Sequence, residues 1–287
     1  MLISRDEYKQ ANLQAEYSTK PWAGLLRWIL ADVRDERRMN RVLGGVDYVI
    51  HAAALKRVGS MAYNPDEAVS TNVIGTWNVA RACVDGKVKR AAFLSTDKAA
   101  YPVNTYGRTK AVAEDLWRSF NFHRPIFTVT RYGNVMASRG SVVEVYRKLL
   151  AKGITEFPVT DPNVTRFWMT PEYACEMAVG ALQDTPGVTL VAMSKAFLLG
   201  DLVAVMGGET RISGLPAHEK QAETILTKYE AGRTVAAKRW LRMAPDVSYD
   251  DRLNYNPDRA PTLYPADLDS TTDIMSREEL RVALEAL

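Results

Sequence analysis

The sequence predicts an α/β fold, in which a doubly wound parallel sheet carries helices on both faces and a smaller mixed α/β domain packs beside it. Two observations support this prediction. Short apolar runs, typical of buried strands, alternate with helical patterns at intervals of roughly 25–35 residues. After Asn134 the alternation changes, and beyond Ser213 the elements are short and separated by prolines. The first pattern is typical of βαβ units, and the second indicates a separate, smaller domain.

Composition limits the classes of function. The chain has 287 residues, of which 47% are hydrophobic, enough for one large domain or two closely joined ones. Its net charge of +3 is too small to indicate a nucleic-acid partner. Two distant cysteines and three histidines predict neither a metal site nor a Ser-His-Asp centre. No apolar run reaches the ~18 residues of a membrane span and no signal peptide opens the chain, so we expect a cytoplasmic protein.

The first half of the chain contains the elements expected of the parallel sheet. The expected strands are apolar and partly β-branched, and the long helix among the expected helices begins at Pro65. In chain order we expect a strand ending at Ser4, a strand over 25–31, a helix over 37–43, a strand over 48–50, a helix over 65–84, a strand over 91–94, a helix over 105–120 and a strand over 126–131.

The second half carries clear helix-start signals. A helix is expected over 142–151, directly after Ser141. Pro171 behind Thr170 predicts a helix over 171–183, because proline is favoured at the first helical position. The sequence from Ser276 to Glu279 matches a capping box and predicts a last helix that reaches about Leu287.

One stretch concentrates reactive side chains where a predicted strand ends. Thr96, Asp97 and Lys98 follow the strand over 91–94, and Tyr106 and Lys110 share one face of the next helix because they are four residues apart. A phenol titrates near ~10, and a neighbouring cation stabilises its ionised form. Open α/β sheets bind ligands at the carboxyl ends of their strands. We therefore predict an acid/base site here; the alternative is a strand–loop–helix connection with a solvated charge pair.

Several further stretches, taken with this one, suggest a family. Tyr-x-x-x-Lys alone is weak evidence, but Thr-Asp-Lys just before it is specific. The chain resembles the extended short-chain dehydrogenase/reductases, and among them the inverting UDP-N-acetylglucosamine 4,6-dehydratases, over stretches that span nearly its whole length: 4–10, 32–35, 51–56, 64–65, 71–76, 94–100, 106–110, 131–135, 138–142, 160–161 and 165–167. The resemblance implies a Rossmann-like dinucleotide-binding domain over 1–135 and 171–200, and a sugar-nucleotide-binding domain over 136–170 and 201–287.

The resemblance also implies a reaction. NADP would remove a hydride from C4 of the sugar, water would leave across C5–C6, and the hydride would return to C6, giving a 4-keto-6-deoxy sugar nucleotide for surface polysaccharide or glycan synthesis. Tyr106 would take the C4 hydroxyl proton, its pKa lowered by Lys110, which would also hold the nicotinamide ribose. Thr96 would hydrogen-bond the same hydroxyl.

Lys98, if neutral in a desolvated pocket, would remove the C5 proton, and Asp97, with a raised pKa, would protonate the departing hydroxyl. This division stays open, because adjacent titratable groups couple.

Binding residues are implied in the same way. Arg5 and Lys9 place two cations where a 2′-phosphate would lie, which favours NADP over NAD, although either could be an exposed charge at a helix start. Further candidates for the cofactor are Asp32, Val33, Ala52, Ala53, Lys56, Tyr106 and Lys110, and those for the UDP-sugar are Lys56, Asn134, Arg139 and Ser141. Arg166 is interpreted as structural. The resemblance further suggests a homo-oligomer such as a hexamer.

The chain departs from the family at its beginning. No G-x-G-x-x-G turn precedes Arg5, so the first strand, the phosphate loop and the first helix of the family are missing, and the strands on either side are expected to lack a partner. We consider a reading frame truncated at Met1, a piece supplied by another polypeptide, or a reduced protein with altered cofactor binding. The family's Arg-Pro-Gly-Glu-Lys is replaced by 216–220, which has lost the arginine.

Two other functions stay open. A related epimerase or reductase would need Tyr106 and Lys110 but not the pair of Asp97 and Lys98. A catalytically silent subunit for binding or assembly would explain the missing phosphate loop, but not the intact set of reactive side chains.

Overall fold

A six-stranded sheet lies at the centre of the protein in the computed structural model, which describes residues 1–122, 124–138, 140–246 and 266–287. Its strand order is β13-β14-β9-β5-β4-β3. Four neighbouring strands are parallel: β3 (Tyr48–His51), β4 (Arg90–Leu94), β5 (Ile126–Arg131) and β9 (Thr189–Ala192). The antiparallel strands β14 (Trp240–Met243) and β13 (Thr234–Ala236) extend the sheet beyond β9. The predicted α/β class with a doubly wound parallel sheet is confirmed.

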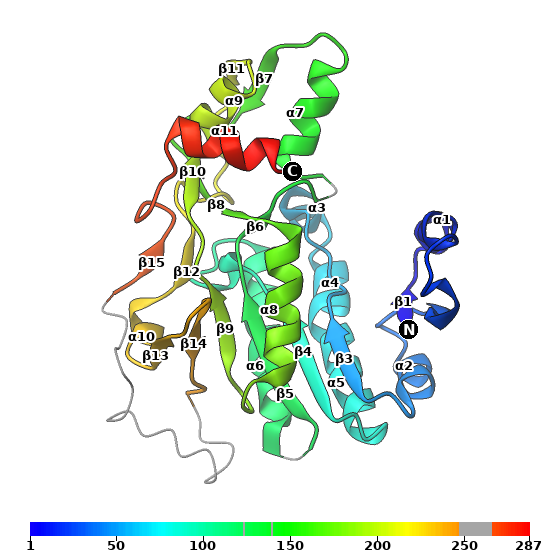
Figure 1. Ribbon diagram of the computed structural model, residues 1–287. Helices are drawn as coiled ribbons and strands as arrows, with labels where there is room; N and C mark the ends of the chain where they lie inside the picture. The colour runs from blue at the N-terminus through cyan, green and yellow to red at the C-terminus, as the bar shows by residue number, and fades with distance from the viewer. Residues whose placement is uncertain (123, 139, 247–265) are drawn as a thin grey trace.

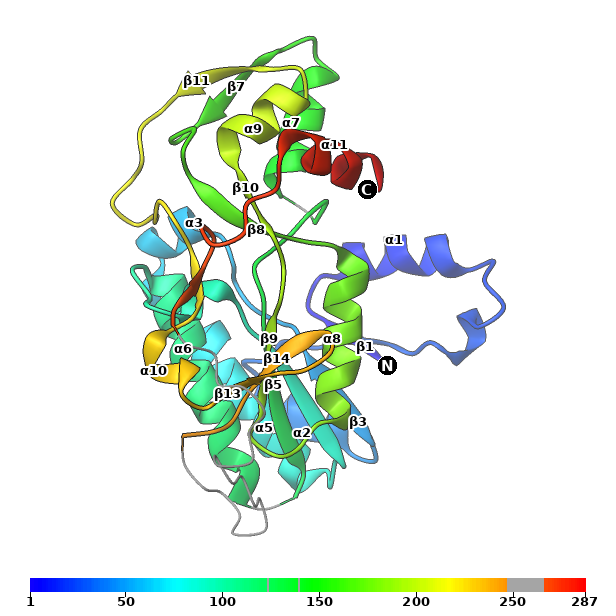
Figure 2. The same cartoon turned by 60° about the vertical axis from the view of Figure 1, so that its left-hand side comes forward.

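Helices cover both faces of this sheet (Figures 1 and 2). On one face lie α2 (Glu36–Leu43), α5 (Gly75–Asp85) and α6 (Thr105–Ser119), and on the other lies α8 (Pro171–Gln183). α6 packs through the fully buried Trp117, whose indole donates to the carbonyl of Thr128 on β5. α8 begins and ends where the sequence predicts, with the Thr170 side chain as its cap.

The predicted helix over 65–84 is present but not uniform. It consists of α4 (Pro65–Ala68), a wider π-helical segment (Val69–Ile74) and α5. The wide segment contains Asn72, whose side chain bonds both backbone groups of Leu55 and the hydroxyl of Thr109. Asn72 thereby ties the loop after β3 to α6.

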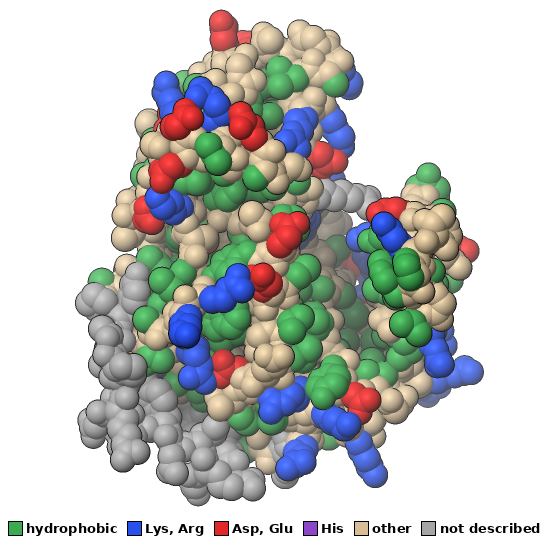
Figure 3. All heavy atoms as spheres, in the orientation of Figure 1, with side chains coloured by type: hydrophobic (Ala, Val, Ile, Leu, Met, Phe, Trp, Pro, Cys, Tyr) green, Lys and Arg blue, Asp and Glu red, His purple; other side chains and the backbone are tan. Residues whose placement is uncertain are grey.

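The first strands stand apart from the main sheet. β1 (Leu2–Ser4) pairs in parallel with β2 (Trp28–Leu30), joined by α1 (Glu7–Tyr17), and the predicted strand over 25–31 starts late because Ala23–Leu25 form a 3₁₀ turn. Within the described residues, β3 pairs with β4 alone. Tyr48 and Ile50 on β3 are 58% and 44% exposed. Figure 3 shows the first residues of the chain, with β1 and α1, as a lobe at the side of the molecule, with hydrophobic side chains on and beside it. Among the described residues, β1 and β3 thus each have a strand neighbour on one side only.

A second layer lies beyond the carboxyl ends of the parallel strands (Figure 1). It has its own core, in which Tyr146, Phe157, Phe197 and Leu202 are fully buried. The last helix starts at Ser276 with the predicted capping box. The elements of this layer and its connections are α3 (Val58–Tyr63), β6 (Asn134–Val135), α7 (Val142–Leu150), β7 (Glu156–Val159), β8 (Thr165–Met169), β10 (Ala196–Leu198), α9 (Leu199–Val205), β11 (Glu209–Ile212), β12 (Thr224–Leu226), α10 (Lys228–Ala231), β15 (Leu268–Asp269) and α11 (Arg277–Glu285).

The division of the chain into two domains stays a prediction. β13 and β14 belong to the segment assigned to the second domain, yet they pair with the main sheet, and β10 from the first segment pairs with β8. Among the described residues, no helix has both the length and the apolar character needed to cross a membrane.

Candidate active site

The predicted acid/base residues lie where β4 ends, as the sequence indicates. Thr96 caps a short 3₁₀ turn (Asp97–Ala99), and its hydroxyl donates to Asp97 Oδ1 at 2.9 Å. Two backbone bonds hold this segment against β5: Ser95 N donates to Thr130 O at 2.7 Å and Asp97 N to Tyr132 O at 2.9 Å. The carboxylate and the amine therefore project from a fixed backbone.

Lys98 lies at the centre of the cluster. Its Nζ is 3.0 Å from Asp97 Oδ1, 3.1 Å from Asn134 Oδ1 and 3.3 Å from Glu223 Oε1. The structure thus brings Asn134, predicted to contact the UDP moiety, directly to Lys98. Glu223 reaches the site from just before β12, and no motif in the sequence predicts it there.

The charge state of Lys98 differs from the expected one. Burial alone would lower its pKa, but the carboxylates of Asp97 and Glu223 outweigh burial and raise it. The condition of a neutral Lys98 is therefore not met in the protein without substrate, because two anions surround the amine. For Asp97 the expected direction is confirmed, since burial raises its pKa, with a contribution from Glu223.

Asp97 is fully buried and uses only one of its oxygens. Oδ1 accepts from Thr96 and Lys98, whereas Oδ2 has no hydrogen-bond partner within the described parts of the chain. An unpaired buried carboxyl oxygen is costly unless it is protonated or meets a ligand. The free oxygen can donate or accept a proton toward a bound molecule.

Tyr106 and Lys110 lie on α6, but they do not interact as expected. Burial raises the pKa of Tyr106, and the cation that opposes this rise is Lys98. Lys110 instead donates to Leu94 O at 2.6 Å and lies 3.7 Å from the centre of the Phe93 ring. Burial lowers the pKa of Lys110 to about 7. The predicted lowering of the Tyr106 pKa by Lys110 is therefore wrong, because Lys110 contacts the end of β4.

Gly107 sets the distance between α6 and the catalytic turn. A Cβ at this position would lie 2.2 Å from the carbonyl oxygen of Lys98. We expect Gly107→Ala to destabilise the fold by about 1–3 kcal/mol, as overpacking usually does, and to displace the turn that carries Lys98. Thermal unfolding would measure the loss, with Gly59→Ala, which has nothing within 4 Å, as the control. Equal unfolding temperatures of the two variants would contradict this explanation.

The segment 216–223 forms one wall of the site. Asn104 Nδ2 donates to His218 O at 2.9 Å, and Lys220 Nζ to Ala100 O at 3.1 Å. Arg166, at 7% exposure, pairs with Glu219 at 2.6 Å. The sequence signal for this wall is the segment 216–220, which replaces the family's Arg-Pro-Gly-Glu-Lys, and Glu223 lies three residues beyond it.

The predicted adenosine end lies at the carboxyl ends of β1 and β2. Asp32 accepts from Arg34 and pairs with Arg5 at 3.2 Å. Hydrogen bonds from Arg34 lower the pKa of Asp32 to about 2 although partial burial opposes this. Val33 packs over Gly75, where a Cβ would meet it at 2.6 Å.

The remaining cofactor candidates are exposed. Lys9 lies in the first turn of α1, where its backbone N–H donates to the cap residue Asp6. Ala52, Ala53 and Lys56 follow β3 in the loop that Asn72 holds. The described residues contain no group of histidine, cysteine or acidic side chains that could bind a metal ion.

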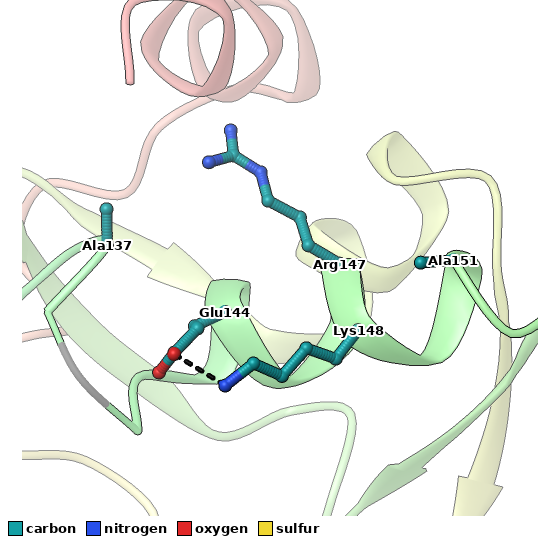
Figure 4. Close-up of a pocket in the computed structure, with 5 residues that line it drawn as sticks. All are labelled: Ala137, Glu144, Arg147, Lys148 and Ala151. Carbon is teal, nitrogen blue, oxygen red and sulfur yellow. Dashed lines mark hydrogen bonds and ion pairs between the residues drawn. The ribbon is translucent and has the colours of Figure 1, made fainter.

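Of the other substrate candidates, Ser141 acts as the cap of α7, where its hydroxyl accepts from Glu144 N. Arg139 lies outside the described residues. A cavity of about 310 Å³ lies beside α7, lined by Ala137, Glu144, Arg147, Lys148 and Ala151 (Figure 4). Glu144 is paired with Lys148 at 2.6 Å there, and none of the predicted catalytic residues lines this cavity.

Comparison with known proteins identifies the family. Residues 1–245 match the model of a family described as polysaccharide biosynthesis protein. The chain belongs to this family. Among its curated relatives, a UDP-N-acetylglucosamine 4,6-dehydratase (inverting) of Campylobacter jejuni is 34% identical over 261 residues, which are 88% of this chain and 77% of that protein.

Two further relatives broaden the comparison. A UDP-glucose 4-epimerase of Rickettsia canadensis is also 34% identical over 261 residues, 85% of this chain and 74% of that protein. The X-ray structure of Pen from Bacillus thuringiensis is 31% identical, covers 99% of this chain and 88% of that one, and superposes with a TM-score of 0.89. Relatives at equal identity to this chain are thus named for two different reactions.

Proposed function

We propose that the chain catalyses the NADP-dependent 4,6-dehydration of a UDP-N-acetylhexosamine, with UDP-N-acetylglucosamine as the substrate. One observation carries the proposal: a buried carboxyl group and an amine, Asp97 and Lys98, are hydrogen-bonded at 3.0 Å in the same cluster as Tyr106. Oxidation at C4 needs a phenol and a cofactor. Loss of water across C5–C6 needs a base and an acid besides.

The hydrogen bond between Lys98 and Asp97 can supply both the base and the acid. Transfer of one proton from Lys98 to Asp97 gives a neutral amine and a neutral acid. The amine then takes the C5 proton, which a C4 ketone has made acidic, and the acid donates its proton to the departing C6 hydroxyl. Both residues have returned to the ion pair when water has left, and the Lys98 ammonium can then give a proton back to C5 as the hydride is returned to C6. Asp97 Oδ2 is the oxygen without a partner in the described structure.

Tyr106 supports the first step of the proposal. Its phenol would take the proton of the C4 hydroxyl, with Thr96, whose hydrogen bond to Tyr106 lowers the tyrosine pKa, orienting the same group. When bound, the nicotinamide would supply the complementary chemistry, accepting a hydride from C4 and returning it at C6.

The residues at the ends of β1 to β3 suit the adenosine half of NADP. Arg5 offers a cation for a 2′-phosphate, and Ala52 and Ala53 leave the backbone after β3 uncovered. No glycine-rich turn for the pyrophosphate is present among the described residues. We place the reaction in the cytoplasm, within a homo-oligomer that makes a precursor of surface polysaccharide or glycan.

A second candidate is a 4-epimerase, which the Rickettsia relative favours. Epimerisation would use Tyr106 at C4 and leave Asp97 and Lys98 without a role, which is why we rank it second.

Product mass separates the two reactions. We expect the chain, incubated with NADP and UDP-N-acetylglucosamine, to yield a product lighter by one water, with a C4 ketone visible by NMR. In deuterated water the product should carry deuterium at C5. Asp97→Asn should abolish the loss of water. A product of unchanged mass would indicate the epimerase instead, and no product would contradict both candidates for this chain.

A further inference from the structure

We propose that Glu223 is a positioning residue of the candidate site, holding the Lys98 ammonium beside Asp97 and Asn134 from the second layer of the molecule. Glu223 Oε1 is 3.3 Å from Lys98 Nζ, and Glu223 is 2% exposed. This role follows from the contacts of Glu223 in the structure. Neither the catalytic motif nor the helix that carries Tyr106 predicts them.

The backbone of Glu223 is fixed independently of its side chain. Its N–H donates to Ser270 Oγ at 2.9 Å, and its carbonyl accepts from Ser270 N at 2.8 Å. Ser270 is fully buried and its hydroxyl also lies 2.6 Å from that of Thr165 on β8. A change confined to the Glu223 carboxylate therefore leaves the anchoring of this segment in place.

The charges around Lys98 come from four parts of the chain. The catalytic turn contributes Asp97, and α6 contributes the Tyr106 phenol. The segment before β12 contributes Glu223 and Lys220, which are paired at 3.2 Å. β8 contributes Arg166, whose Nε lies 3.9 Å from Glu223 Oε1.

Glu223 is thus the anion shared by three cations, Lys98, Lys220 and Arg166. Without its charge, Lys98 would keep Asp97 as its only paired anion among the described residues and would face the positive charge of Arg166. An ammonium that loses an opposite charge within ~4 Å gives up its proton more readily. Glu223 therefore sets both the place of the Lys98 amine and how readily that amine releases its proton. This second role rests on the proposed function.

Lysine NMR tests the inference without requiring turnover. With ¹³Cε-labelled lysine and Lys98→Arg to assign the signal, we expect Lys98 in the parent chain to stay protonated to the highest pH at which the chain is folded. In Glu223→Gln its titration should move to lower pH by about one unit or more. Glu223→Asp, which keeps the charge, should restore most of the parent behaviour.

The matched control is Glu219→Gln. Glu219 lies on the same segment and pairs with Arg166 at 2.6 Å, but it makes no ion pair with Lys98 in the described structure. Its removal should shift the Lys98 titration much less. Identical Lys98 titrations in the parent chain, Glu223→Gln and Glu219→Gln would overturn the proposal, and so would equal shifts in the two variants. If Glu223→Gln fails to fold, Glu223→Asp and Glu223→Ala are compared instead. Equal shifts of the Lys98 titration in these two variants would also overturn the proposal, because only Glu223→Asp keeps the negative charge.

The rate profile gives the second readout. Where the chain turns over the UDP-sugar, the acidic limb of kcat/KM should move to lower pH in Glu223→Gln, because both Lys98 and Asp97 lose a charge that raises their pKa. A variant that lowers kcat/KM uniformly, without moving the limb, would show a structural role and overturn the positioning role. Absence of turnover in the parent chain would instead contradict the proposed function and leave the NMR result to decide on Glu223.

Discussion

Tyr106→Phe is expected to lower turnover of the UDP-sugar by about 10²–10⁴-fold, the usual contribution of a general acid/base group. The variant keeps the ring, its packing and the fold, and removes only the hydroxyl that would take the C4 proton. Because C4 oxidation comes first, the variant should form no reduced nicotinamide, which absorbance would follow in a single turnover. Asp97→Asn, in contrast, should still form it, because Asp97 acts only after the ketone exists.

The control for Tyr106→Phe is Tyr101→Phe. Tyr101 lies in the same connection between β4 and α6, but its hydroxyl donates to Asp267 at 3.3 Å and contacts none of the predicted catalytic residues. Its turnover should stay close to that of the parent chain. Turnover of Tyr106→Phe within a few-fold of the parent would remove Tyr106 from the proposed mechanism.

The same tyrosine predicts a dependence on pH. Burial raises its pKa, so Tyr106 is protonated at neutral pH in the protein without ligands. Initial rates should therefore rise as the pH is increased through the range in which the chain stays folded. Lys98 does not add to this rise, because in the proposed mechanism its proton passes to Asp97 within the ion pair and not to the solvent.

Local signals in the sequence predict much of the fold. Thr170 and Pro171 define the start of α8, and Ser276 with Glu279 defines the start of the last helix, because a cap depends on a few neighbouring residues. The position of Thr96, Asp97 and Lys98 at the end of β4 also follows from local pattern, since a buried apolar run precedes them.

What the sequence does not predict depends on distant residues. The charge of Lys98 is decided by Glu223, and the surroundings of Lys110 by the Leu94 carbonyl and the Phe93 ring. Spacing places Tyr106 and Lys110 on one helical face, but it cannot say which of two lysines lies nearer the phenol. Likewise β13 and β14 are three and four residues long, too short for a periodic pattern to show that they join the main sheet.

The largest loss of stability is expected from Glu114→Gln. Glu114 lies on α6 one turn beyond Lys110 and is 1% exposed. Its carboxylate is 2.7 Å from Arg131 of β5 and 3.3 Å from Arg118. Removing one partner of a buried ion pair leaves the others without a counter-charge, which costs about 3–5 kcal/mol. We expect the unfolding temperature to fall by on the order of 10 °C.

Lowering the pH should reduce the difference in stability between the parent chain and Glu114→Gln. Burial would raise the pKa of Glu114, but Arg131 and Arg118 outweigh it and lower the pKa to about 2. A carboxyl group with a depressed pKa stabilises the fold above its ordinary titration range and loses that contribution as the pH falls. The difference in unfolding free energy between the parent chain and Glu114→Gln should therefore be largest near neutral pH and should decrease from about pH 4.5 toward pH 2.

Asp115→Asn is the matched control for burial. Asp115 is the next residue and contacts the same Arg118 at 2.7 Å, but its side chain is 76% exposed. Exposed ion pairs contribute about 0–1 kcal/mol, so this variant should unfold close to the parent chain. Because both variants remove one negative charge beside Arg118, an equal loss of stability in the two would mean that net charge, and not the buried network with Arg131, holds α6 to the sheet.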